Sequence, residues 1–237
     1  MFVEHNFFVG LEDIDFNNNL KIKSLLGFLE DIGGIHSNLV GYGLLDIPIK
    51  KRSWILINWK VKILKRPRYA ENLKIKTWAY GMEKLYALRD FEVFNEAGEL
   101  VIIASSKWVC LDTEKQSIIK VEDKLRDAYT IENKRVFEDD IEKLKEPENY
   151  IKETSVQITR DMIDVNRHVH NINYMDFATH ILPYEVMQQA TNIEVMYKKE
   201  IKETDKIKCK YAVENNSHYV VIKSEDDKVL HAIIKLS

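Results

Sequence analysis

The segment from Asp164 to Tyr174, which reads DVNRHVHNINY, holds residue types that transfer of an acyl group to water requires. Asp164, Asn166 and His168 alternate, so along an extended segment their side chains would point to one side. A helix is predicted directly after them, and its first N–H groups carry partial positive charge. This set could bind and polarise a carbonyl group and activate a water molecule. A purely structural role is the alternative, because Asp and Asn often cap helices and a loop histidine can simply bond a neighbour.

A weak internal repeat bears on that choice. The two halves of the chain align as Asp15 with Asp164, Asn17 with Asn166, and Asn19 with His168. Further on, VFNEAGELVIIASSK (93–107) lines up with VIKSEDDKVLHAIIK (221–235). Both loops keep the Asp and the Asn, and the second alone has the imidazole. This pattern favours a duplicated fold in which one copy carries the chemistry.

Each half has the same predicted elements around its polar loop. A short strand (3–9; 154–160) precedes the loop and a helix follows it, from Ile22 to about Val40 and from Asn171 to Leu182. Strand-like runs rich in β-branched and aromatic residues come next. These runs are 54–64, 72–81, 86–95 and 100–112, then 193–201, 206–215, 218–225 and 228–236. A helix followed by an antiparallel meander, twice over, is the layout of an α+β double hot dog fold.

The bulk composition is that of a globular protein with few linker residues. We expect a first hot dog domain over 1–128, a charged connector over 129–150 and a second domain over 151–237. The net charge of −3 gives no electrostatic reason to expect nucleic acid as a partner. No secretory signal or membrane span is visible, so a cytoplasmic location is expected. Cys110 and Cys209 lie in apolar strands, which favours two reduced core thiols. No cofactor or metal motif is present, so none is predicted.

The chain resembles the acyl-acyl-carrier-protein thioesterases of plants and bacteria. The similar stretches, together with the Trp54 strand, are DFNNNLKIKSLLGFLEDIGGIHSNLVGYG (15–43), KRPRYAENLKIKTW (65–78), LRDFEVFNEAGELVIIASSKWVCLD (88–112), DVNRHVHNINY (164–174) and VMYKKEIKETDKI (195–207). The family's loop reads D-x-N-x-H-V-N-N, and a later strand carries Y-x-x-E followed by cysteine. The resemblance implies a double hot dog fold, hydrolysis of a fatty acyl thioester, and a catalytic set of Asp164, Asn166, His168 and Glu200.

Two departures from the family pattern affect the expected chemistry. His170 stands where the family usually has Asn, and Ile201 stands where the plant proteins have cysteine. A cysteine nucleophile is therefore not expected. Glu200 or Asp164 would act as general base on a water molecule, with direct attack by Asp164 left open, while backbone N–H groups of residues 169–171 would stabilise the oxyanion. The alternative for Glu200 is a solvated side chain in a charge run.

The resemblance also implies a substrate and a partner. An apolar tunnel for the acyl chain is expected in the first half, although its candidate lining residues could equally be plain core: Leu25, Leu29, Ile32, Trp54 and Ile57. Acyl carrier protein is acidic, so a basic docking patch is expected. The candidates, which could instead be merely solvated, are Lys62, Lys65, Arg66 and Arg68, or Lys198, Lys199 and Lys202.

Two other functions compete with this prediction. One is an acyl-coenzyme A thioesterase of the same fold, and the other is a non-catalytic acyl-binding hot dog protein. Relative rates on the two carriers would separate the first, and binding without turnover would identify the second. Because one chain supplies both halves, a monomer would suffice, and a homodimer of the fused chain is the other possibility.

Overall fold

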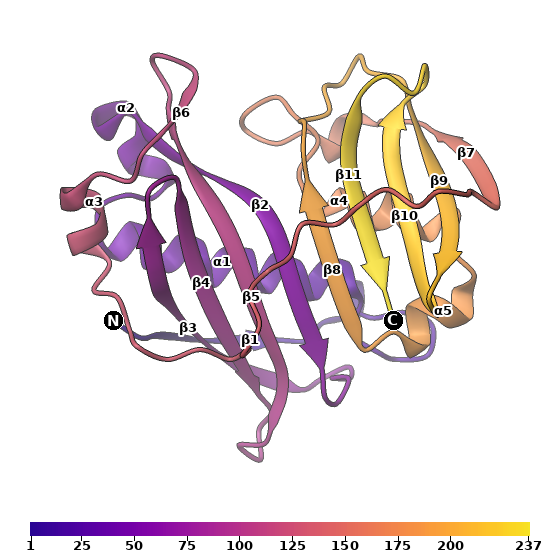
Figure 1. Ribbon diagram of the computed structural model, residues 1–237. Helices are drawn as coiled ribbons and strands as arrows, with labels where there is room; N and C mark the ends of the chain where they lie inside the picture. Colours follow the sequence, from indigo (N-terminus) through magenta and orange to yellow (C-terminus); the bar gives the residue numbers. More distant parts are fainter. The chain divides into compact units, whose positions relative to one another are not determined.

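The chain forms two compact units. The computed structural model describes residues 1–237, which separate into Met1–Ile141 and Glu142–Ser237 (Figure 1). The predicted connector, residues 129–150, is thus divided between them. Each unit combines helix with an antiparallel sheet, as an α+β fold requires. No helix is both long enough and apolar enough to cross a membrane.

The first unit pairs one long helix with a strongly hydrogen-bonded sheet. The strands follow the order β1-β3-β4-β5-β2, all neighbours are antiparallel, and β6 pairs with β5. The elements are β1 (Val3–Phe8), α1 (Ile22–Leu39), α2 (Ile47–Lys50), β2 (Arg52–Ile63), β3 (Asn72–Glu83), β4 (Tyr86–Phe94), β5 (Leu100–Asp112), β6 (Ser117–Ile119) and α3 (Asp123–Ala128), with short 3-10 turns at Leu11–Asp13 and Leu44–Asp46. The helix and the four long strands therefore lie close to where the sequence predicts them.

Helix α1 forms because its apolar residues recur at helical spacing. Its buried residues are Ile22, Leu25, Leu26, Leu29, Ile32, Gly33 and His36. They face the sheet and contact β1 and β3. The helix ends just before Gly41, whose φ of 74° lies in the left-handed region that glycine adopts without steric cost.

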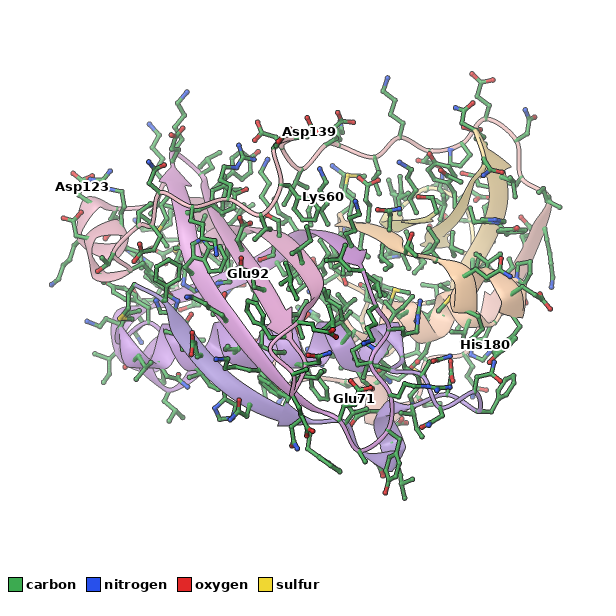
Figure 2. All side chains as sticks on the ribbon, turned by 90° about the horizontal axis from the view of Figure 1, so that it is seen from below. Lys60, Glu71, Glu92, Asp123, Asp139 and His180 are labelled. Atoms are coloured by element: carbon green, nitrogen blue, oxygen red, sulfur yellow. The ribbon has the colours of Figure 1, made fainter.

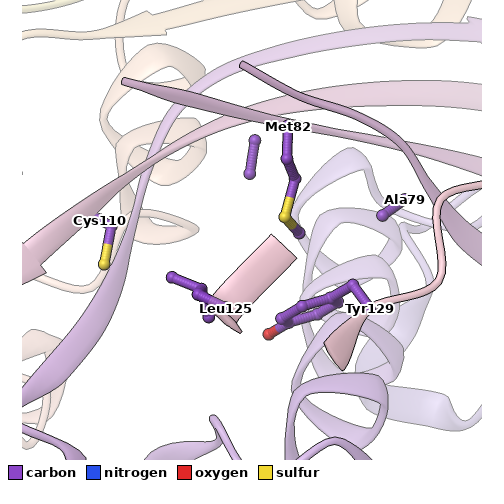
Figure 3. Close-up of a cluster of buried hydrophobic side chains, with 6 residues drawn as sticks. Ala79, Met82, Cys110, Leu125 and Tyr129 are labelled. Atoms are coloured by element: carbon purple, nitrogen blue, oxygen red, sulfur yellow. The ribbon is translucent and has the colours of Figure 1, made fainter. Parts of the chain in front are cut away.

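A second buried cluster lies in the first unit beside the main core. It consists of Ala79, Met82, Ala87, Cys110, Leu125 and Tyr129 (Figure 3). Leu125 comes from α3 and Tyr129 follows that helix directly, so the segment after the last strand is anchored in the core. Burial of these apolar side chains stabilises the C-terminal part of the unit.

Residues 130–141 continue along the sheet face opposite α1. The Trp78 indole N–H donates to the Lys134 carbonyl at 2.7 Å, and the Val136 N–H donates to the Asp90 carboxylate at 2.8 Å. Lys60 reaches the Asp139 carbonyl at 3.4 Å (Figure 2). This segment, which we call the strap, is held to the first unit by side chains of β2, β3 and β4.

The second unit repeats the sheet with shorter helices. Its strand order is β8-β11-β10-β9-β7, again with antiparallel neighbours. The elements are β7 (Lys152–Val156), α4 (Asn173–Thr179), α5 (Tyr184–Gln189), β8 (Asn192–Tyr197), β9 (Ile207–Glu214), β10 (Ser217–Ser224) and β11 (Leu230–Leu236), with a 3-10 turn at Arg160–Met162. The single predicted helix from Asn171 to Leu182 is shorter than expected. Pro183 opens α5, where its fixed φ and missing N–H cost nothing.

Strand register confirms the internal repeat. Val3 pairs with Thr77 and Phe7 with Leu73 in the first unit; Lys152 pairs with Tyr211 and Val156 with Ile207 in the second. These pairs correspond position by position, with β1 matching β7 and β3 matching β9.

The predicted alignment of 93–107 with 221–235 is wrong in register. Val93 pairs with Ile102, and its counterpart Ile222 pairs with Ala232, so the alignment is displaced by one residue before the turn and by two after it. The second hairpin turn is one residue longer. Because strand side chains alternate between faces, a shift of one residue reverses every side chain, and backbone pairing is needed to fix it.

Candidate active site

The residues Asp164 to His168 form a closed turn. The Asp164 N–H donates to the His168 carbonyl at 2.8 Å, and Arg167 has a φ of 63°. The Asp164 Oδ1 accepts the N–H groups of Asn166 at 2.8 Å and His168 at 3.1 Å. The predicted extended alternation of these side chains is therefore wrong, because the Asp164 carboxylate folds the following backbone around itself.

The first unit builds the same turn without an imidazole. The Asp15 Oδ1 accepts the N–H groups of Asn17 at 2.8 Å and Asn19 at 3.0 Å, and Asn18 has a φ of 65°. The Asp15 N–H donates to the Asn19 carbonyl at 2.9 Å. The same bonds exist in a loop that lacks histidine. The bonds of Asp164, like those of Asp15, therefore hold the conformation of the loop.

Glu200 lies beside this loop, in the irregular segment after β8 that we call the Glu200 turn. Strand β8 ends at Tyr197, earlier than the predicted 193–201, and Glu200 is exposed. The Val169 N–H donates to the Ile201 carbonyl at 2.8 Å, and His168 pairs with Lys202 in an isolated antiparallel bridge. Backbone pairing thus brings the His168 loop and the Glu200 turn side by side. The Glu200 carboxylate makes no hydrogen bond or ion pair in the structure, so it is available to a ligand.

The corresponding turn of the first unit carries the opposite charge. The Leu20 N–H donates to the Pro67 carbonyl at 2.8 Å, and Asn19 pairs with Arg68. These contacts match those of Val169, so Arg66 occupies the place of Glu200. Burial lowers the pKa of Arg66, and Asp15 opposes that effect. The first unit therefore has neither the imidazole nor the second carboxylate.

The backbone donors expected for an oxyanion are largely occupied. The Val169 N–H is used in the bond to Ile201, and the His170 N–H donates to the Met162 carbonyl at 2.9 Å. Of the three predicted donors, the Asn171 N–H remains. Helix α4 begins two residues later, at Asn173. The expectation of several N–H groups at one helix N-terminus is therefore wrong for residues 169 and 170.

Two buried residues next to Glu200 were not predicted as site residues. Tyr174 is 2% exposed, and its hydroxyl lies next to the Ile201 backbone. Burial raises the pKa of Tyr174 well above its usual range, and the charges of Glu200 and Asp164 raise it further. His231 is 3% exposed, and its Nδ1–H donates to the Lys199 carbonyl at 3.0 Å. Tyr174 lies within the polar motif, but nothing in the sequence links His231 to it.

Neither cysteine is placed for nucleophilic chemistry. Both thiols are buried and unpaired. Burial raises the pKa of Cys110 to about 11 and that of Cys209 to about 12, which keeps both protonated near neutral pH. No group of His, Cys, Asp and Glu side chains is arranged to hold a metal ion.

Family models match nearly the whole chain. The acyl-ACP thioesterase N-terminal domain matches residues 2–129, and the acyl-ACP thioesterase C-terminal domain matches residues 144–236. Among curated proteins, an oleoyl-acyl carrier protein thioesterase of Coriandrum sativum is 24% identical over 85% of this chain. A palmitoyl-acyl carrier protein thioesterase of Cuphea hookeriana is 24% identical over 82% of it. The chain spans 60% and 51% of the length of these two relatives.

Solved structures share the fold over its full length. An acyl-ACP thioesterase from Bacteroides thetaiotaomicron VPI-5482 superposes with a TM-score of 0.87 at 20% identity, covering 99% of this chain and 96% of that one. A 12:0-ACP thioesterase from Umbellularia californica gives 0.87 at 17% identity, covering 100% and 96%. These matches confirm the predicted α+β double hot dog fold.

Proposed function

This chain belongs to the acyl-ACP thioesterase family, and on that basis we propose that it hydrolyses fatty acyl thioesters of acyl carrier protein to free fatty acid and carrier, the step that ends fatty acid synthesis. The observation that carries the proposal is the pairing of the His168 loop with the Glu200 turn in the second unit. The same pairing in the first unit lacks both functional groups.

Glu200 is the general base in the proposed mechanism. Its carboxylate is exposed and makes no internal bond, so it can take a proton from a water molecule that attacks the thioester carbonyl carbon. The water oxygen forms the new C–O bond, and the C–S bond breaks when the tetrahedral intermediate collapses. His168 donates a proton to the leaving thiolate and regains one from Glu200, directly or through solvent, which restores both groups; the Asn166 amide and the Asn171 N–H stabilise the oxyanion.

Asp164 has a positioning role in this mechanism. Its Oδ1 already accepts two backbone N–H groups, and Asp15 makes the same bonds in the first unit. These bonds hold the carboxylate against its own loop and support a role in orienting Asn166 and His168. They argue against direct attack by Asp164 on the acyl group.

The docking surface for the acidic carrier is proposed next to this loop. Lys198, Lys199 and Lys202 are exposed and make no ion pair. The alternative patch in the first unit is less suitable, because Lys65 is paired with Glu99 at 3.0 Å and Arg66 is half-buried. Free lysines beside the site would attract a negatively charged partner.

The acyl chain is assigned to the first unit. Leu25, Leu29 and Ile32 are buried on the face of α1 that meets the sheet, and an alkyl chain requires such apolar surroundings. The acyl-binding role of this unit and the cytoplasmic location stay predictions.

The decisive experiment measures thiol release from matched acyl-ACP and acyl-coenzyme A substrates over a range of chain lengths, with His168→Ala in parallel. Fast release from the carrier protein, lost in the variant, is expected. Faster release from coenzyme A would identify an acyl-coenzyme A thioesterase. Acyl-ACP binding without release from either carrier would identify a non-catalytic acyl-binding protein.

A further inference from the structure

Among the positions at which the two units differ around the turn that carries Glu200, four hold side chains that bear on its chemistry. Two of these positions hold the proposed functional groups, His168 in place of Asn19 and Glu200 in place of Arg66. The other two are Tyr174, where the first unit has Leu25, and His231, where it has Val101. The match of His231 with Val101 rests on the Lys198 N–H donating to the His231 carbonyl at 2.8 Å, as the Leu64 N–H donates to the Val101 carbonyl at 2.8 Å.

Tyr174 contacts the backbone on the C-terminal side of Glu200. Its hydroxyl lies next to the backbone N–H of Ile201, a fully buried residue. Ring contacts with Phe177 at 5.9 Å and Tyr197 at 5.3 Å fix the Tyr174 side chain. In the first unit the matching residue is Pro67, which has no N–H, and the matching helix position is the apolar Leu25. The hydroxyl is thus present only in the unit whose turn offers an N–H beside it.

His231 contacts the backbone on the N-terminal side of Glu200. Its Nδ1–H donates to the Lys199 carbonyl at 3.0 Å from a buried position on β11. Because a carbonyl can only accept, Nδ1 must carry the proton. Val101 cannot make the equivalent bond in the first unit.

We propose that Tyr174 and His231 are positioning residues that clamp the backbone on both sides of Glu200 and so set where its carboxylate lies. The Glu200 side chain has no hydrogen bond of its own, so the turn backbone determines its position. A general base must be held to within a fraction of an ångström to act on one water molecule. This inference rests on the proposed hydrolysis, in which Glu200 is the base.

The test compares kcat and KM of Tyr174→Phe and His231→Val on acyl-ACP. Each variant removes one polar contact with the turn backbone and is expected to lower kcat by about tenfold while KM changes by less than about twofold. His231→Asn, whose side-chain N–H can replace Nδ1–H, is expected to recover most of the loss. Tyr211→Phe is the matched control. It removes a tyrosine hydroxyl bonded to His218 at 2.7 Å elsewhere in the same unit and is expected to retain full turnover.

A double-mutant cycle separates positioning from general destabilisation. If Tyr174 acts through Glu200, Tyr174→Phe has no further effect on the residual rate of Glu200→Gln. Additive losses in that background, or wild-type kcat in both single variants, would overturn the inference. Amide hydrogen exchange at Ile201 reports the clamp independently of activity and is expected to accelerate in Tyr174→Phe; unchanged exchange would count against it. An inactive wild-type protein would instead refute the proposed function.

Discussion

Among single residues, Asp164 and His168 have different tasks although they share one loop. Asp164 bonds the backbone that carries His168, and Asp15 does the same in a loop without histidine. We therefore expect Asp164→Asn, which keeps an acceptor oxygen, to retain turnover within about tenfold of the wild type, and Asp164→Ala to lose about 100-fold or more. Rate measurements on acyl-ACP check this. Abolished turnover in Asp164→Asn, with the loop intact, would support direct attack by the carboxylate instead.

The matched variant in the first unit is Asp15→Ala. It breaks the same two hydrogen bonds and is expected to cost about 1–2 kcal/mol of unfolding free energy, as Asp164→Ala does in its own unit. Denaturant unfolding measures both. Because Asp15 lies in the loop without an imidazole, its replacement should leave kcat within about twofold.

His168 is expected to be dispensable for folding and essential for turnover. His168→Asn installs the residue that the first unit carries at Asn19, in a loop of the same conformation. The fold should therefore be retained, while loss of the proton donor lowers kcat by about 100-fold or more. Asn166→Ala should also remove most turnover. Near-normal rates in both variants, with unchanged melting temperatures, would rule out this site.

Site residues were predictable from the sequence where a reactive residue type stands in a motif that the other half of the chain partly repeats. Asp164, Asn166 and His168 stand out because the first half keeps two of the three. Tyr174 and His231 do not stand out, because a buried tyrosine or histidine has no sequence signal until the backbone atom it bonds is known. The closed turn was missed because the Asp164 carboxylate, rather than strand pairing, determines the local backbone.

At the scale of elements, periodicity located helix α1 and the long strands but not their pairing. The apolar face of α1 repeats every three or four residues, and the strands are rich in β-branched residues. The end of β8 was placed four residues late, because the charged run after Tyr197 has no turn residue to mark it. That error concealed the fact that Glu200 lies in the irregular segment after β8. Strand ends and register depend on cross-strand hydrogen bonds, which composition does not encode.

The strap is bonded to Asp90 of β4, and the titration of this carboxylate predicts how the stability of the protein depends on pH. The pKa of Asp90 is raised from 3.8 to about 6, chiefly by burial with a smaller contribution from Glu92, while Ser105, the hydrogen bond from Val136 and Arg135 oppose the shift. The folded state thus binds more protons than the unfolded state between pH of about 4 and 6. The stability that protonated Asp90 contributes is present at low pH and is lost as pH rises through 6.

Asp90→Asn removes this titration and keeps an acceptor for the Val136 N–H. At pH 7 the variant should be more stable than the wild type by about 1–2 kcal/mol, and the difference should vanish below a pH of about 4. Denaturant unfolding at several pH values measures it. A difference that does not change with pH, or a less stable variant at pH 7, would contradict the role given to Asp90.

For the whole molecule, recognition of an acidic carrier cannot rest on total charge, because the chain itself carries −3. Attraction must come from local basic surface, and unpaired lysines beside the Glu200 turn provide it. The double variant Lys198→Glu/Lys202→Glu is therefore expected to raise KM for acyl-ACP about tenfold. Acyl-pantetheine lacks the carrier and carries no charge. The KM of the double variant for acyl-pantetheine should therefore stay within about twofold of the wild-type value.

The matched control reverses two unpaired charges in the first unit, Lys62→Glu/Arg68→Glu, and should leave both KM values near those of the wild type. Salt gives a second measure. Screening weakens attraction between exposed charges, so the wild-type KM for acyl-ACP should rise with ionic strength, while that of the Lys198/Lys202 variant should not. If the KM for acyl-ACP rises in the Lys62→Glu/Arg68→Glu variant instead, the carrier docks on the first unit. If acyl-pantetheine is affected as strongly as acyl-ACP, the two lysines act on the Glu200 turn rather than on the carrier.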